Sequence, residues 1–198
     1  MAIPSTDRGP WTRDECEHLI AAGQLDGRRF ELIEGELVSR IGEKRPHLDA
    51  VNYVSGWFER VFGKELAYTE APIDVAPQDN PTSEPEPDVS VLKKPGWRFE
   101  KYAGRADIHL VVEVSDTTLA YDLSVKAGLY ARAGILEYWV LDAVGRKLFV
   151  HRAAVDGRYT EVRMLAGSDG IAPLAASDEV FVVAAVFEKW AEARLAGQ

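Results

Sequence analysis

The sequence lacks three features that would narrow its class at once: cysteine pairs, long apolar runs and a basic surface. Cysteine occurs once, at Cys16, which excludes an internal disulfide and any multi-cysteine metal site. We expect Cys16 to be a small buried apolar side chain. No apolar run is long enough to span a bilayer, and residues 1–6 carry no signal-peptide pattern. We therefore expect a cytoplasmic protein with no membrane partner.

Basic residues are also too few to suggest a protein that coats nucleic acid. The formal net charge is −9, whereas non-specific binding to phosphates needs a dominant basic surface. A local basic patch is still compatible with this charge. Residues 93–106 are the one segment that interleaves lysine and arginine with aromatic side chains. That segment fits contacts with phosphates and bases, and it equally fits a solvated loop with aromatic anchors.

The elements that are present predict a mixed α/β domain. At 198 residues the chain is expected to form a single domain over residues 1–198, with residues 1–10 as a loose lead-in. Helical spacing and end signals predict helices at residues 11–23, 46–62, 118–133 and 184–195. Apolar runs and turn pairs predict a hairpin at residues 29–38, strands at residues 65–76, 88–92, 107–115 and 137–142, and a second hairpin joining residues 146–152 to residues 159–165.

The stretch 107–115 is the centre of this pattern. It is rich in Val, Ile and Leu on both faces, as is typical of a central strand in a covered sheet. Glu113 lies near its end. A carboxylate rarely enters such a strand unless it is paired or holds a metal. Glu113 is therefore a candidate site residue.

Two further residues stand out near this strand. Asp88 follows a proline-rich loop and begins a short strand, where it is either a turn-capping residue or a presented carboxylate. Lys126 lies on the apolar stripe of helix 118–133, although lysine is almost never fully buried unless paired. It either extends to solvent along its stem, pairs with Asp122 one turn earlier, or serves a site.

His47 raises a similar question. It begins the apolar stripe of the helix 46–62, at the positive end of that helix. It is either a packed, hydrogen-bonded histidine or a side chain beside a site.

Together these residues suggest chemistry on a phosphodiester. If the strands that carry Asp88 and Glu113 are neighbours, their carboxylates can share a hard cation such as Mg²⁺. The cation would activate a water and offset charge on a scissile phosphate. Lys126 could orient or deprotonate that water and stabilise the transition state.

The same residues resemble a known family. Pro87-Asp88-Val89, Val112-Glu113-Val114-Ser115, Lys126 with Tyr130-Ala131, and Glu137-Tyr138-Trp139-Val140 together resemble the Uma2 (DUF820) family. Its members are described as candidate endonucleases of the PD-(D/E)XK superfamily, which has the restriction-endonuclease-like fold. The resemblance extends upstream through residues 30–37 and His47, and covers nearly the whole chain.

The resemblance implies a fold, a site and an activity. The implied fold is a mixed β-sheet core flanked by helices, and the implied site holds Mg²⁺, with Mn²⁺ as a substitute, on Asp88 and Glu113. The superfamily lysine two residues after the glutamate is replaced by Ser115, and the helix after the strand supplies Lys126 instead. Further matches to the family pattern, together with polar neighbours of the site, give the auxiliary candidates Glu31, Glu34, His47, Ser115 and Asp122.

The resulting hypothesis is a metal-dependent DNA endonuclease. A homodimer is compatible with it, because cutting both strands usually needs two sites. The alternative is a catalytically inactive member of the same fold that binds DNA or a protein, which the acidic balance favours. A third interpretation makes Lys126 and Glu113 a buried ion pair that serves only the fold.

Overall fold

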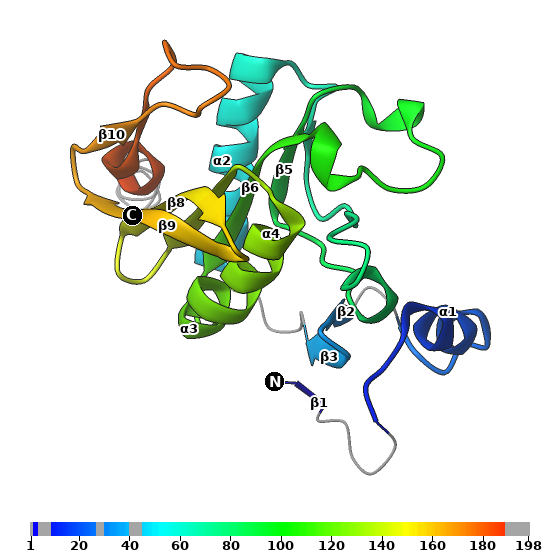
Figure 1. Ribbon diagram of the computed structural model, residues 1–198. Helices are drawn as coiled ribbons and strands as arrows, with labels where there is room; N and C mark the ends of the chain where they lie inside the picture. Colours follow the sequence, from blue (N-terminus) through cyan, green and yellow to red (C-terminus); the bar gives the residue numbers. More distant parts are fainter. Residues whose placement is uncertain (1, 4–8, 27–29, 40–44, 189–198) are drawn as a thin grey trace.

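A six-stranded mixed sheet forms the centre of the computed structural model, which describes residues 2–3, 9–26, 30–39 and 45–188 (Figure 1). The strand order is β4-β5-β6-β7-β8-β9, and β6 and β7 are the parallel pair while the other neighbours are antiparallel. The strands are β4 (Ala67–Tyr68), β5 (Val89–Leu92), β6 (Ile108–Ser115), β7 (Glu137–Asp142), β8 (Lys147–Val155) and β9 (Arg158–Ala166).

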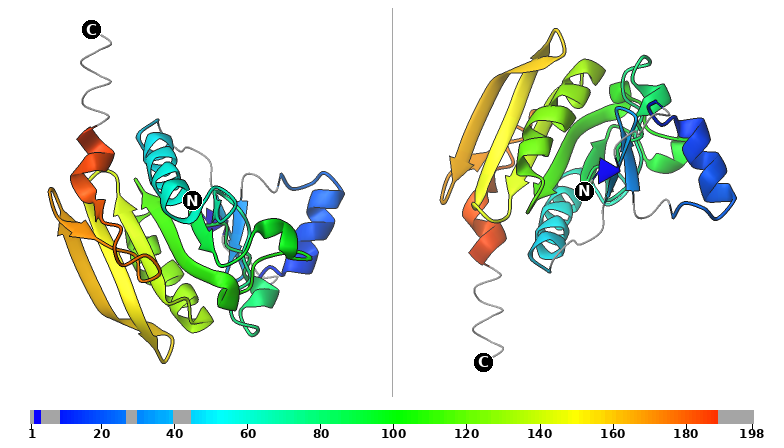
Figure 2. Two further views of the ribbon diagram at one scale, coloured as in Figure 1. Left: turned by 90° about the horizontal axis from the view of Figure 1, so that it is seen from above. Right: turned by 90° about the horizontal axis from the view of Figure 1, so that it is seen from below.

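Helices cover both faces of this sheet, as Figure 2 shows. The helix α2 (Arg45–Phe62) packs against β4, β5 and β6 on one face. On the other face, a continuous helical segment connects β6 to β7 and consists of α3 (Leu119–Tyr121), η5 (Asp122–Lys126) and α4 (Ala127–Ala133). The predicted mixed sheet flanked by helices is thus confirmed.

The central strand β6 behaves as its composition predicts. Seven of its eight residues are buried, and the eighth is half-buried. Val112 and Val114 point into the cluster under α2, whereas Val111 points into the cluster under α4. Because side chains alternate along a strand, Glu113 lies on the face of Val111, toward α4.

A second, small sheet carries the N-terminal hairpin. It has the order β1-β3-β2, with β1 (Ala2–Ile3), β2 (Phe30–Ile33) and β3 (Glu36–Ser39). Glu34 and Gly35 both have positive φ, 50° and 80°, as the predicted two-residue turn requires. Residues 2–3, expected to belong to a loose lead-in, instead pair with β3. Arg29, the first residue of the predicted hairpin, lies outside the described residues.

The first helix, α1 (Arg13–Ala21), begins with the predicted capping box of Thr12 and Glu15. Cys16 is buried beside Leu32 and Leu37, as expected.

Three short 3₁₀ helices lie in the connections that flank β5. The connection from β4 to β5 contains η2 (Asn80–Thr82), and the connection from β5 to β6 contains η3 (Gly96–Arg98) and η4 (Arg105–Asp107). The described residues close with the small sheet of β10 (Gly170–Ile171) and β11 (Phe181–Val182) and a helical turn at residues 183–188. The rest of the predicted helix 184–195 lies outside the described residues.

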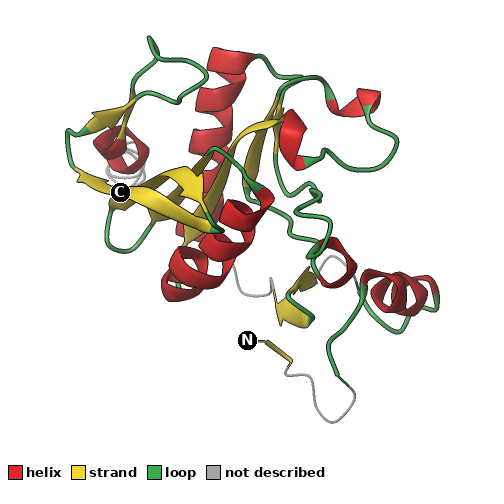
Figure 3. Cartoon of the chain, in the orientation of Figure 1, coloured by secondary structure: helices red, strands yellow, loops and turns green. Residues whose placement is uncertain are grey.

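Two predictions of secondary structure are wrong in part. The predicted strand 65–76 is reduced to β4, because Glu70 takes a positive φ of 50° and Pro72 follows (Figure 3). Its later backbone N–H groups instead donate to loop carbonyls, as Ile73 does to Pro85. The predicted α-helix 118–133 is interrupted by η5, a π-helical turn.

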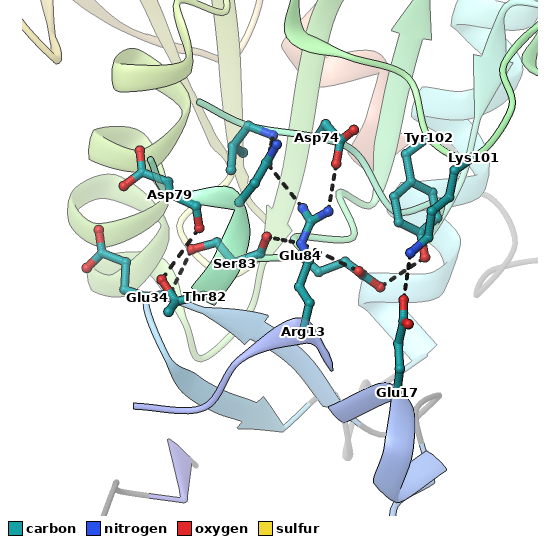
Figure 4. A network of polar contacts seen from close by, with 12 residues as sticks. Arg13, Glu17, Glu34, Asp74, Asp79, Thr82, Ser83, Glu84, Lys101 and Tyr102 are labelled. Carbon is teal, nitrogen blue, oxygen red and sulfur yellow. Dashed lines mark hydrogen bonds and ion pairs between the residues drawn. The ribbon is translucent and has the colours of Figure 1, made fainter. Parts of the chain in front are cut away.

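Polar contacts dock the N-terminal elements on the core, as Figure 4 shows around Arg13. The Arg13 guanidinium donates to the Ser83 carbonyl and to Asp74, both at 2.7 Å, and to Asn80 at 3.2 Å. The proline-rich loop also joins β2 directly, since the Glu84 N–H donates to the Leu32 carbonyl at 2.7 Å. These contacts hold β2, and with it Glu31, against the main sheet. No helix in the described part of the chain is long and apolar enough to cross a membrane.

Candidate active site

The register of β5 and β6 brings Asp88 and Glu113 face to face. Val89 pairs with Val112 in this antiparallel ladder, so Asp88, one residue before β5, lies across from Glu113. Residues in such positions share one face of the sheet, with Cβ atoms roughly 4.5–5.5 Å apart. The two strands are therefore neighbours, which the metal hypothesis requires.

Asp88 is fixed in orientation by the strand opposite. Its Oδ2 accepts a hydrogen bond of 2.6 Å from the backbone N–H of Val114. Its Oδ1 lies 3.4 Å from Nε2 of His47, the first inward residue of α2. Both residues are buried, at 6 % exposure each. His47 is thus packed and also lies beside the site.

Lys126 is turned inward and contacts two carboxylates. Its Nζ lies 3.0 Å from Glu113 Oε2 and 2.8 Å from Glu31 Oε1, and its side chain is only 6 % exposed. Its ion-pair partners are therefore Glu31 and Glu113, and the lysine does not extend to solvent. The second oxygen of Glu113, Oε1, accepts from the Tyr130 hydroxyl at 2.8 Å.

Burial and mutual repulsion set the protonation of this cluster. Burial raises the pKa of Glu113 well above its ordinary value, and Asp88 and Glu31 raise it further, while Lys126 opposes them. Burial alone would lower the pKa of Lys126, but Glu113 and Glu31 outweigh it and leave that pKa raised. The Lys126 ammonium is therefore charged.

The π-helical turn η5 explains how one short segment presents two polar side chains inward. The Ala127 N–H donates to the carbonyl of Asp122, five residues earlier, and widens the helix there. Asp122 Oδ2 accepts from the hydroxyls of Ser115 and Thr118, at 2.5 and 2.6 Å. Ser115, which stands where the superfamily has lysine, therefore ties the end of β6 to the turn that carries Lys126.

Asp88, Glu113 and Lys126 line one cavity of about 100 Å³. Six carboxylates line it against a single lysine: Glu31, Glu86, Asp88, Glu113, Asp116 and Asp122. The carboxylate oxygens that line it are the kind of ligand that a hard divalent cation prefers. No group of three or more His, Cys, Asp or Glu side chains among the described residues has the geometry of a ready metal cage. A site that uses one or two carboxylates with water and phosphate oxygens is the usual arrangement for Mg²⁺, and Asp88 and Glu113 fit it.

Glu34 and residues 93–106 lie apart from this cavity. Glu34 is exposed on the hairpin turn and pairs with Arg132. The segment 93–106 connects the end of β5 to the start of β6, whereas Asp88 and Glu113 lie at the opposite ends of these strands. Five residues of extended strand, from Ile108 to Glu113, span about 17 Å.

Sequence reasoning missed several side chains of the site. Glu86, Asp116 and Tyr121 line the cavity, and Tyr130 holds Glu113. A signal for Glu86 is present, since Glu84, Glu86 and Asp88 alternate with prolines and so recur on one side of an extended segment. Tyr121 could not be assigned, because its direction depends on the π-helical turn that follows it.

The chain matches the family model "Uma2: Putative restriction endonuclease" over residues 14–182. It belongs to the Uma2 family. No curated protein matches this Uma2 chain. Among solved structures, it is similar to one described as "a putative nuclease belonging to DUF820 from Anabaena variabilis ATCC 29413". That likeness has a TM-score of 0.65 and 16 % identity, and covers 90 % of this chain and 98 % of the other.

The family and the structural likeness support different statements. At 16 % identity the likeness shows that this Uma2 chain shares the fold of the Anabaena variabilis protein. The family match associates the chain with nucleases, in agreement with the expected restriction-endonuclease-like core.

Proposed function

We propose that this Uma2 protein is a divalent-metal-dependent endonuclease that hydrolyses phosphodiester bonds of DNA. The observation that carries the proposal is the convergence of Asp88, Glu113 and Lys126 on one acidic cavity. Membership of a family whose description reads "Putative restriction endonuclease" supports the reaction class and the substrate.

Asp88 and Glu113 would hold the cation. Each presents a carboxylate to the cavity, from neighbouring strands whose register is fixed by backbone hydrogen bonds. When bound, Mg²⁺ or Mn²⁺ would lower the pKa of a bound water and offset charge on the scissile phosphate. The excess of carboxylates over lysine gives the cavity a negative field that favours a cation.

Lys126 supplies the fixed positive charge of the site. Its Nζ lies within 3.0 Å of Glu113, so it would lie close to any phosphate oxygen that approaches the cation. There it would orient the attacking water and stabilise negative charge in the transition state. Glu31 holds the ammonium from its other side, at 2.8 Å, and is a positioning residue.

His47 and Tyr130 hold the two ligands in place. His47 Nε2 lies 3.4 Å from Asp88, and Tyr130 donates to Glu113. Because both are buried, they restrict each carboxylate to one orientation and exclude bulk water from one side of the site.

The test is cleavage of supercoiled plasmid DNA by the purified chain, with and without MgCl₂ or MnCl₂. We expect nicked and linear products only with metal, and a loss of at least roughly a hundredfold in rate for D88N, E113Q and K126M. E34Q, on the same hairpin as Glu31 but outside the cavity, is the matched control and should cleave like the wild type. Metal-independent cleavage, or full activity in E113Q, would overturn the proposal. DNA binding without metal binding in calorimetry would favour the catalytically inactive alternative.

A further inference from the structure

The last strand of the main sheet has one unpaired edge. β9 pairs with β8 on one side, and no other strand of the described residues pairs with its second side. Figure 2 shows β9 at the outer rim of the sheet in both views. The N–H and C=O groups along such an edge are a template for another strand.

Two apolar side chains on β9 are exposed where a sheet face is usually covered. Val162 and Met164 are 54 % and 57 % exposed. They lie beside His151 and Phe149 of β8, on the face that carries α4. Single exposed apolar residues are common, but a pair on one face of an unpaired edge strand indicates a surface suited to contact.

The two side chains that flank Val162 carry opposite charges, so the segment is complementary to an antiparallel copy of itself. Glu161 precedes it and Arg163 follows it, and both side chains are exposed on the opposite face of the strand. If a second β9 runs antiparallel with the two Val162 residues facing each other, Glu161 of each copy lies opposite Arg163 of the other. Opposite charges in directly facing positions stabilise a strand pair, and here the contact occurs twice.

Charged residues on edge strands usually prevent pairing, because like charges meet. The order Glu161-Val162-Arg163 instead brings opposite charges together when an identical strand pairs with it in antiparallel register. A two-fold interface requires this kind of self-complementary surface, since each residue must meet its counterpart.

We propose that β9 is a homodimer interface, formed by antiparallel pairing with β9 of a second copy of this chain. The pairing joins two six-stranded sheets into one continuous sheet. The site strand β6 lies three strands away from β9, so the interface leaves the acidic cavity open. The two β6 strands are separated by seven strand spacings, roughly 34 Å. This proposal does not depend on the nuclease activity.

The first test is sedimentation of the full chain between about 1 and 100 µM, a range suited to a small interface. We expect the wild type to dimerise, and E161R and R163E each to raise the dissociation constant roughly tenfold or more, since two like-charge contacts replace two attractive ones. The double variant E161R/R163E restores the opposite-charge contacts and should dimerise within about threefold of the wild type. E100R, with the same change of charge on an exposed residue of the β5–β6 connection, should not alter the dissociation constant.

The second test does not depend on charge. V162C places two thiols opposite each other, and mild oxidation should yield a covalent dimer, because facing residues of an antiparallel pair lie at disulfide distance. V155C, also exposed on the same hairpin, is the control and should stay uncrosslinked. A wild type that is monomeric over the whole range, single variants that dimerise as well as the wild type, failure of the double variant to recover, or equal crosslinking of V155C and V162C would each overturn the proposal.

Discussion

The Lys126 ammonium lies 3.0 Å from the Glu113 carboxylate, although one comes from a π-helical turn and the other from the central strand. Both side chains are buried, and Glu31 contacts the same ammonium from a separate sheet at 2.8 Å. Three elements of the fold therefore meet in one charge cluster. Substitutions in this cluster can be compared for their effect on the free energy of unfolding and for their effect on cleavage, so a structural role and a catalytic role can be distinguished.

Replacing Lys126 by methionine should destabilise the metal-free protein and abolish cleavage. The substitution leaves Glu31 and Glu113 buried without their counter-charge, at a cost of about 3–5 kcal/mol in the free energy of unfolding. A divalent cation would restore positive charge there. We therefore expect a larger rise in Tm with MgCl₂ for K126M than for the wild type, measured by thermal unfolding with and without metal. An equal or smaller rise in K126M would show that the cation binds elsewhere.

The N-terminal hairpin offers a matched pair of variants. E31Q removes a carboxylate that contacts Lys126 within the cavity, whereas E34Q removes an exposed carboxylate that pairs with Arg132. We expect E31Q to reduce the cleavage rate about tenfold or more, because the Lys126 ammonium loses one of the two carboxylates that position it. E34Q should leave the rate unchanged. Rates under single-turnover conditions check this. Similar rates for the two variants would contradict the role given to Glu31.

Two buried glutamates on neighbouring strands, Glu113 and Glu137, should differ in how their replacement by glutamine changes the stability of the protein. The pKa of Glu113 is raised by burial, so its charge is costly, and E113Q should be at least as stable as the metal-free wild type. Glu137 Oε1 instead accepts from Arg152 and Trp139, and its Oε2 from the Leu174 N–H. E137Q should therefore lose about 3 kcal/mol or more.

Urea unfolding of E113Q, E137Q and the wild type without metal compares these effects. Calorimetry supplies the second readout: E137Q should keep the metal affinity of the wild type, and E113Q should lose at least about tenfold. Destabilisation of E113Q to the extent of E137Q would favour the interpretation that Glu113 and Lys126 serve only the fold.

Arg13 is expected to support the site from a distance. Its guanidinium joins α1 to Ser83, Asp74 and Asn80, and so holds the loop that precedes Asp88 (Figure 4). R13A should lower the free energy of unfolding by about 2–3 kcal/mol, and R13K should recover little, because lysine lacks the planar fork. Unfolding in urea checks both variants. Full recovery in R13K would show that charge alone explains the effect.

The local patterns of the sequence were sufficient to predict the central strand β6 and to single out Glu113 in it. β6 is buried on both faces because it is apolar on both faces, and Thr12 with Glu15 forms the capping box that their spacing indicates. The helical stripe placed Lys126 among apolar residues and marked it as anomalous, but left open whether its ammonium extends to solvent, pairs with Asp122 or serves a site. These features depend on residues close together in the chain, so their periodicity reveals them.

Features that depend on distant contacts could not be derived from the local pattern of the sequence. Glu31 was named only through the family resemblance, because it reaches the site when the proline-rich loop pairs with β2, at a sequence separation that no periodicity reports. The strand predicted at residues 65–76 fails because its backbone N–H groups bond to loop carbonyls instead of a ladder. The π-helical turn is stabilised by Tyr138 and Ser115, on other elements, which bond to Asp122.

Anomalous diffraction from a crystal soaked in MnCl₂ tests the central claim most directly, because it locates the cation without relying on activity. We predict one peak in the acidic cavity, about 2.1 Å from one carboxylate oxygen of Asp88 and one of Glu113. The peak should vanish in D88N and persist in E34Q. A cavity without a peak, or a peak that neither Asp88 nor Glu113 contacts, would contradict the proposed metal site.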